Sequence, residues 1–153
     1  MHLDELTTFI VAAKRATYVG GGTPALASRA GAHDLTFEQG AFAYRDSYFG
    51  GTDFLGQEVV WHESEPVWAM NYHGYITRPE HIDARRAGAT IKAALGAMYD
   101  EGRFLGSLEW QGPHGRYVDA SEGSTAHFRG REYILVDGLE AYALDYGGGL
   151  IKP

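Results

Sequence analysis

Asp46, in the middle of the chain, is the acidic residue whose surroundings favour chemistry most. It lies in the alternating run Phe42 to Phe49, where every second side chain shares one face of a strand. If four-residue turns join the neighbouring strands, that face also carries aromatic and amide side chains from three strands, namely Tyr44, Tyr48, Gln57, Trp61, Trp68 and Tyr72. A carboxylate is costly to bury unless it is hydrogen-bonded, and burial raises its pKa. We therefore expect an aromatic-lined pocket in which Asp46 orients a small molecule or acts as a general base. The alternative is a structural carboxylate whose hydrogen bonds come from tyrosine hydroxyls and Gln57.

Glu58 is the second candidate acid, and its surroundings recur at Glu132. In the same register Arg45 lies opposite Glu58 on the other face of the ribbon, and Asn71 lies beyond it on the next strand. We expect Arg45 and Glu58 to form a cross-strand ion pair worth ~0.2–1 kcal/mol on a solvated or interface face. The competing hypothesis is a cofactor-free acid/base enzyme in which Asp46 or Glu58 works with a tyrosine as proton donor.

Patterns typical of other catalytic sites are missing from the sequence. There is no cysteine, which excludes disulfides, thiolate nucleophiles and cysteine-based zinc sites. The seven histidines lack metal-ligand spacing to one another. The glycine runs 20–22 and 147–149 do not connect a strand to a following helix as phosphate loops do, and no Gly-x-Ser-x-Gly motif is present. We predict no metal and no cofactor.

Length and charge limit the class of protein. A chain of 153 residues with 44% hydrophobic and 22% charged residues is typical of one globular domain, 1–153. A net charge of -7 disfavours direct nucleic-acid binding and binding to anionic membranes. No apolar run reaches the ~20 residues of a membrane span, and no signal peptide is visible. These features predict a cytoplasmic protein that binds neither nucleic acid nor membrane.

The periodicity of apolar residues predicts two helices and several antiparallel strands. One helix begins at Leu3, carries Lys14 and Arg15 in its last turns and is ended by the glycines 20–22. A second follows the capping pattern Thr77-Arg78-Pro79-Glu80 and ends at Gly102. Residues 23–33 are predicted as a loop, and residues 104–110 are compatible with a continuing helix. Alternation and turn residues predict strands over 35–37, 42–49, 54–62, 67–76, 116–120, 125–136 and 140–151. The order of helix, strands, helix, strands favours an α+β fold over a doubly wound parallel sheet.

The chain also carries an internal repeat. The pattern Phe54-x-Gly56-x-Glu58 returns 74 residues later, and at the same offset Trp68 to Gly74 matches Tyr142 to Gly148. This gapless match favours an internal duplication with halves at roughly 1–77 and 78–153. We expect two helix-plus-β-meander halves related by pseudo-twofold symmetry, similar to cystatin-like or saddle-shaped folds.

Several motifs together resemble a bacterial and archaeal family of domains of unknown function. The family occurs as single-domain proteins or behind helix-turn-helix domains of the XRE type. The resemblance spans nearly the whole chain, although this sequence has Gln111 where the family has Arg. The motifs are Phe9, Ala13-Lys14, Thr17-Tyr18, Tyr44-x-Asp46-x-Tyr48, Gly50-Gly51, Phe54-x-Gly56-x-Glu58-Val59-Val60, Pro66-Val67-Trp68-x-Met70-Asn71-Tyr72-x-Gly74, Gly112-Pro113, Phe128-x-Gly130-x-Glu132, Tyr142-x-Leu144-Asp145-Tyr146 and Gly148.

The resemblance implies no established reaction, and the fusion to DNA-binding modules suggests a sensor of small molecules. Our leading expectation is therefore a small-molecule-binding or sensing domain with an aromatic pocket. A homo-oligomeric interaction module is a further hypothesis. It would dimerise through the face of Arg45, Glu58 and Asn71 or through an open sheet edge.

Overall fold

Two helices and nine strands make up the part of the chain that the computed structural model describes, residues 1–152. Helix α1 (Leu3–Lys14) continues into the π-helical turn η1 (Arg15–Val19), and helix α2 spans Ala84–Asp100. The strands are β1 (Thr23–Ala25), β2 (His33–Gln39), β3 (Phe42–Gly50), β4 (Phe54–His62), β5 (Glu65–Ile76), β6 (Leu108–Gly112), β7 (Gly115–Ser124), β8 (His127–Val136) and β9 (Leu139–Leu150).

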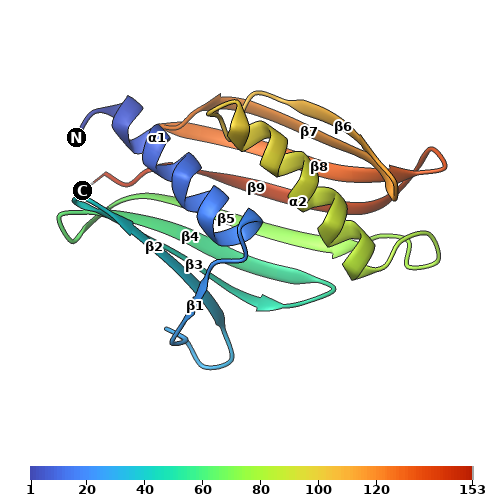
Figure 1. The fold of residues 1–153 in the computed structure, drawn as a ribbon, viewed down its shortest axis with the longest axis horizontal. Helices are drawn as coiled ribbons and strands as arrows, with labels where there is room; N and C mark the ends of the chain where they lie inside the picture. Colours follow the sequence, from blue (N-terminus) through green and yellow to red (C-terminus); the bar gives the residue numbers. More distant parts are fainter. Residues whose placement is uncertain (153) are drawn as a thin grey trace.

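All nine strands form one antiparallel sheet in the order β1-β2-β3-β4-β5-β9-β8-β7-β6. The strands β1 to β5, which follow α1, form one half of the sheet, and the strands β6 to β9, which follow α2, form the other; the halves meet where β5 pairs with β9. Both helices cover the same face of the curved sheet (Figure 1). The prediction of two helices packed on an antiparallel sheet is confirmed. No helix within residues 1–152 is both long and apolar enough to cross a membrane.

The core lies between the helices and this inner face of the sheet. One apolar stripe on each helix is buried against it; the stripes are Leu6, Phe9, Ile10 and Ala13 on α1, and Ala87, Ile91, Ala94 and Met98 on α2. Trp68 is fully buried near the centre, stacks on the ring of Phe128 and donates a 3.0 Å hydrogen bond to the carbonyl oxygen of Thr125. Since this contact joins β5 to the β7–β8 turn, it ties the two sides of the sheet together.

Three local predictions differ from the structure. Helix α2 begins at Ala84 because the Asp83 carboxylate accepts a 2.8 Å hydrogen bond from the backbone N–H of Arg86 and caps the helix. The pattern that starts at Thr77 therefore lies before the helix. Residues 108–112 form strand β6, which pairs with β7, and residues 23–25 within the predicted loop form the short strand β1.

The register of the β3–β4–β5 ribbon also differs by one residue from the prediction. Gly50 has a φ of 90°, so β3 extends to pair Gly50 with Phe54 and leaves a loop of only three residues. At the next turn Glu63 and Ser64 both have positive φ, which makes a two-residue hairpin turn where we expected four residues. The inner face consequently carries Tyr44, Asp46, Tyr48, Glu58, Val60, Trp68, Met70 and Tyr72.

Candidate functional site

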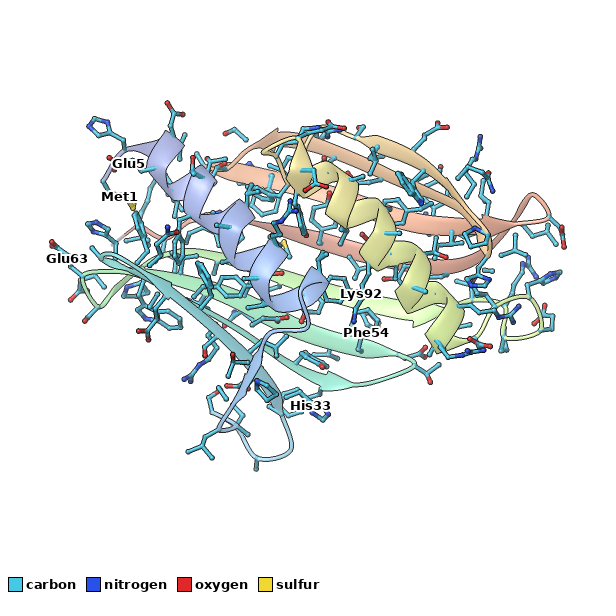
Figure 2. The ribbon with its side chains drawn as sticks, in the orientation of Figure 1. Met1, Glu5, His33, Phe54, Glu63 and Lys92 are labelled. Atoms are coloured by element: carbon cyan, nitrogen blue, oxygen red, sulfur yellow. The ribbon has the colours of Figure 1, made fainter. Side chains whose placement is uncertain are left out.

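A cavity of about 410 Å³ lies between the inner face of the sheet and the two helices. The end of α1 and the turn η1 contribute Lys14 and Tyr18 to its wall, and one face of α2 runs along the opposite side. Lys92 of α2 and Phe54 of β4, both labelled in Figure 2, also line this cavity. Four carboxyl groups line the same cavity: Asp46, Glu58, Asp119 and Glu132.

Asp46 is held on the cavity wall by Tyr72, whose side chain passes over the glycine of the strand between them. The Tyr72 hydroxyl donates a 2.6 Å hydrogen bond to Asp46 Oδ1. Its ring lies over Gly56, where a Cβ atom would be 2.4 Å from the phenol oxygen. Because Gly56 pairs directly with Tyr72 on the neighbouring strand, only a residue without a side chain leaves room for the ring to reach Asp46 on β3.

The same arrangement occurs on the other side of the sheet. The Tyr146 hydroxyl donates a 2.7 Å hydrogen bond to Asp119 Oδ1, and its ring lies over Gly130, where a Cβ atom would be 2.3 Å from the phenol oxygen. Tyr72 and Tyr146 are opposite each other on the central strands β5 and β9. Since each tyrosine bonds an aspartate of its own half of the sheet, the two phenols point in opposite directions from the centre.

Glu58 forms a buried ion pair with Lys14. The ammonium nitrogen lies 2.8 Å from Oε1, to which it donates a hydrogen bond, and 2.6 Å from Oε2. The Oε2 atom accepts no directed hydrogen bond from residues 1–152. Lys14 is only 5% exposed and its ammonium also lies 5.7 Å from the centre of the Phe104 ring. A pair of charges this deeply buried is stable only as a pair, because removal of either partner leaves the other charge uncompensated.

Glu132 is bound by two tyrosine hydroxyls instead of a cation. Tyr117 donates a short hydrogen bond to Oε2, and Tyr142 donates a 2.9 Å hydrogen bond to Oε1. All three side chains are buried. Glu132 lies directly opposite Asp119 in the β7–β8 register, just as Glu58 lies opposite Asp46 in the β3–β4 register.

Burial shifts the protonation of these acids. Desolvation and the negative charge of Glu58 raise the pKa of Asp46 to about 7, although the Tyr72 hydrogen bond and the charge of Lys14 oppose the shift. Desolvation also raises the pKa of Glu132 to about 7 against the effect of its two tyrosine donors. The pKa of Asp119 is raised by burial as well, and the hydroxyls of Tyr146 and Ser121 oppose it. Two acids of the cavity are therefore poised to exchange protons near neutral pH.

The sequence of this chain matches one protein-family model. The family model described as "Domain of unknown function (DUF5680)" matches residues 46–151, which is more than half of the chain. This protein belongs to the DUF5680 family. No curated protein and no solved structure matches it. The DUF5680 match contains all four cavity acids, whereas Lys14 lies in the helix that precedes it.

Three of the seven residues that we expected at the pocket line the cavity of this DUF5680 domain: Asp46, Tyr48 and Tyr72. Tyr44 and Trp68 lie on the same inner face but are buried in the core, outside the cavity wall. Gln57 and Trp61 lie on the outer face of the sheet, because the shorter turns reverse their expected direction. There the side-chain amide of Gln57 donates a 2.9 Å hydrogen bond to Asn71.

The predicted ion pair between Arg45 and Glu58 is wrong. Arg45 lies opposite Val59 on the outer face and contacts Asp34, with 3.5 Å between Arg45 Nε and Asp34 Oδ2. Glu58 points into the cavity and pairs with Lys14. A dimer interface built from the outer face therefore cannot include the Glu58 carboxylate.

Asp119, Lys14 and the tyrosines around Glu132 are site residues that the sequence reasoning missed. A signal for Asp119 is present, because Tyr117-x-Asp119 repeats the pattern Tyr44-x-Asp46 shortly before the second Phe-x-Gly-x-Glu motif. Lys14 appears in the family motif Ala13-Lys14, but nothing in the sequence indicated its burial, since a lysine in the last turn of a helix is usually solvated and complements the helix dipole. Within residues 1–152, no group of three or more histidine or acidic side chains is arranged to hold a metal ion.

Proposed function

We propose that this DUF5680 domain binds a small organic molecule in the cavity between its helices and its sheet. The observation that carries the proposal is the cavity itself. Its volume of about 410 Å³ falls in the range of about 300–1,000 Å³ typical of small-molecule sites. Its wall combines aromatic rings with a few convergent polar groups, among which the Asp46 carboxylate, held in place by the Tyr72 hydroxyl, supplies a fixed acceptor.

The experiment that tests this proposal fills the cavity without disturbing the fold. Gly88 of α2 lines the cavity, and a Cβ atom at this position would meet no atom within 4 Å. The Gly88→Leu variant should fold at least as stably as the wild type, because leucine favours a helix over glycine by roughly 0.5–1 kcal/mol. The matched control is Ala89→Leu, which adds a leucine at the neighbouring exposed position.

A thermal-shift screen against metabolites should then find compounds that stabilise the wild type and Ala89→Leu but not Gly88→Leu. Compounds that stabilise all three proteins equally bind elsewhere and count against the cavity. A screen without any stabilising compound contradicts the proposal directly.

An acid/base enzyme without a cofactor is the second candidate function. The pKa of Asp46, raised to about 7, and the tyrosine hydroxyl only 2.6 Å away favour it, because a general base works best when its pKa is near the working pH. Carbon-detected NMR titration of the carboxyl groups tests this candidate. Ordinary ionisation of Asp46 and Glu132 near pH 4 excludes it.

The proposal includes an internal duplication of the domain. Besides the sequence repeat, both halves have a β-bulge, at Val60/Trp61 and at Ile134/Leu135. Both also have the tyrosine–glycine–aspartate arrangement. These matching details support pseudo-twofold symmetry between the halves.

The partner and location of the domain remain predictions. The likeness to domains that follow XRE-type helix-turn-helix modules supports a sensing role in transcription regulation. A cytoplasmic location and a homodimer are expectations from the sequence, and sedimentation at high protein concentration tests the second.

A further inference from the structure

The charges around the cavity are strongly unbalanced. Four carboxyl groups line it, and the lysines among its described lining residues are Lys14 and Lys92. Lys14 is engaged with Glu58. Lys92 is exposed at the surface of α2, and its ammonium lies 5.6 Å from the centre of the Tyr18 ring. Once the Lys14–Glu58 pair is set aside, three carboxyl groups and the ammonium of Lys92 remain on the cavity wall. The cavity therefore holds more acid than base, which favours a cationic ligand over an anionic one.

Some of this acidity is not satisfied within the protein. Asp119 is 3% exposed, and its Oδ2 atom accepts no hydrogen bond of normal geometry from the described residues, although the nearby Ser121 hydroxyl opposes the rise of its pKa. The Oε2 atom of Glu58 also accepts no directed hydrogen bond from the described residues, but the Lys14 ammonium lies 2.6 Å from it and compensates its charge. Buried polar atoms are normally hydrogen-bonded, so the Asp119 Oδ2 atom at the cavity wall favours a ligand that brings a positive charge or a hydrogen-bond donor.

The aromatic rings of the cavity suit a positive charge. Tyr18, Tyr48, Phe54 and Tyr72 line the part of the cavity near Asp46. The face of an aromatic ring attracts cations, and the effect grows when the cation is desolvated. Aliphatic side chains, among them Ile76, Ile91 and Leu95, also line the cavity and can cover an apolar body.

We propose that the ligand is an organic cation, an ammonium-type nitrogen on an apolar body, whose charge is bound at Asp46 against the aromatic wall. The Asp119 carboxyl group adds to the attraction without direct contact, whereas the charge of Glu58 is compensated by Lys14. This inference rests on the proposed function, because it names the chemical class of the ligand for the same cavity.

Three probes with one aromatic body and different charges test it: 1-naphthylmethylammonium, 1-naphthylmethanol and 1-naphthylacetate. Their binding to the full chain is measured by NMR shift perturbation of cavity residues, with the wild type and the variants Gly88→Leu, Asp46→Asn and Asp145→Asn. Asp145→Asn is the control for net charge, because this acid is exposed on β9 and lies outside the cavity lining. The Asp46→Asn variant keeps an oxygen that can accept the Tyr72 hydrogen bond.

We expect the cation to bind at least about tenfold more tightly than the alcohol, and the acetate to bind weakest. Asp46→Asn should weaken binding of the cation by about tenfold or more and leave binding of the alcohol within about twofold, while Asp145→Asn changes neither. If the alcohol or the acetate binds as tightly as the cation and Gly88→Leu blocks that binding, the cation proposal is overturned and the cavity remains a ligand site. If none of the probes binds at millimolar concentration, both proposals are overturned.

Discussion

Asp46 lies directly opposite Glu58 on neighbouring strands, and both carboxyl groups point into the same cavity. Two acids this close disfavour each other's ionisation, which is one cause of the raised pKa of Asp46. The ammonium of Lys14 stabilises the pair by compensating one of the two charges. This relationship explains why a lysine is buried in the last turn of α1.

The effects of substituting Lys14 and Glu58 on the unfolding free energy should be strongly non-additive. Lys14→Met leaves the Glu58 charge uncompensated and should cost about 3–5 kcal/mol of unfolding free energy, measured by urea denaturation at pH 7.5. The double variant Lys14→Met/Glu58→Gln removes both charges and should recover most of this loss. If the double variant loses as much as the two single variants combined, the pair makes no mutual contribution and the assignment is wrong.

Glu132 should make the domain less stable as the pH rises. Its pKa is 4.5 in an unfolded chain and about 7 in the fold, so between these values the folded state binds more protons than the unfolded state. The stabilising contribution is therefore fully present below about pH 4.5 and is lost as the pH rises through 7. At about 1.4 kcal/mol per pKa unit, the difference is on the order of 3 kcal/mol.

The measurement compares the wild type with Glu132→Gln by urea denaturation from pH 4.5 to pH 8. The stability of the wild type relative to Glu132→Gln should fall steadily across this range. A constant difference between the two proteins contradicts the raised pKa. The comparison removes the contributions of other groups, such as Asp34 and Glu140, whose lowered pKa values act in the opposite sense.

The sequence predicted the elements better than the faces of the strands. Helical spacing located α1 and the body of α2, because a one-sided apolar stripe is a strong signal over several turns. Strand faces depend on turn length, and a change of one residue exchanges them. The positive φ of Gly50, Glu63 and Ser64 shortened both turns, and positive φ at the last two is uncommon for such residues.

The candidate site was predicted in part for the same reason. Each of the two turns shifts the register by one residue, and each shift exchanges the faces of the next strand. The two exchanges cancel between β3 and β5, so Asp46, Tyr48 and Tyr72 still share one face. Gln57 and Trp61, on β4 between these strands, moved to the outer face, and Glu58 moved inward. The role of Lys14 could not be predicted, since it depends on how α1 lies across the sheet.

The hydroxyl of Tyr72 should lower the pKa of Asp46. It donates a hydrogen bond to the carboxylate, and such a bond to a charged group is worth about 1.5–3 kcal/mol. Tyr72→Phe should therefore raise the pKa of Asp46 further, by about one to two units, in a carbon-detected NMR titration. Tyr75→Phe on the same strand is the control, because Tyr75 lies outside the cavity lining and should leave Asp46 unchanged. An unchanged pKa in Tyr72→Phe contradicts the role of this hydrogen bond.

Gly56 should be required for the contact between Tyr72 and Asp46. A Cβ atom at Gly56 would lie 2.4 Å from the phenol oxygen of Tyr72 and 2.7 Å from Cβ of Tyr48, so Gly56→Ala must displace the ring. We expect a loss of about 1–3 kcal/mol in urea denaturation and a shifted Asp46 titration in NMR. Gly51→Ala is the matched control, because a Cβ atom there would meet no atom within 4 Å.

Gly130→Ala should show the same loss through Tyr146, whose phenol oxygen would lie 2.3 Å from the added atom. If Gly56→Ala is as stable as Gly51→Ala, the ring of Tyr72 does not cross the strand at this point, and Asp46 is positioned by other contacts.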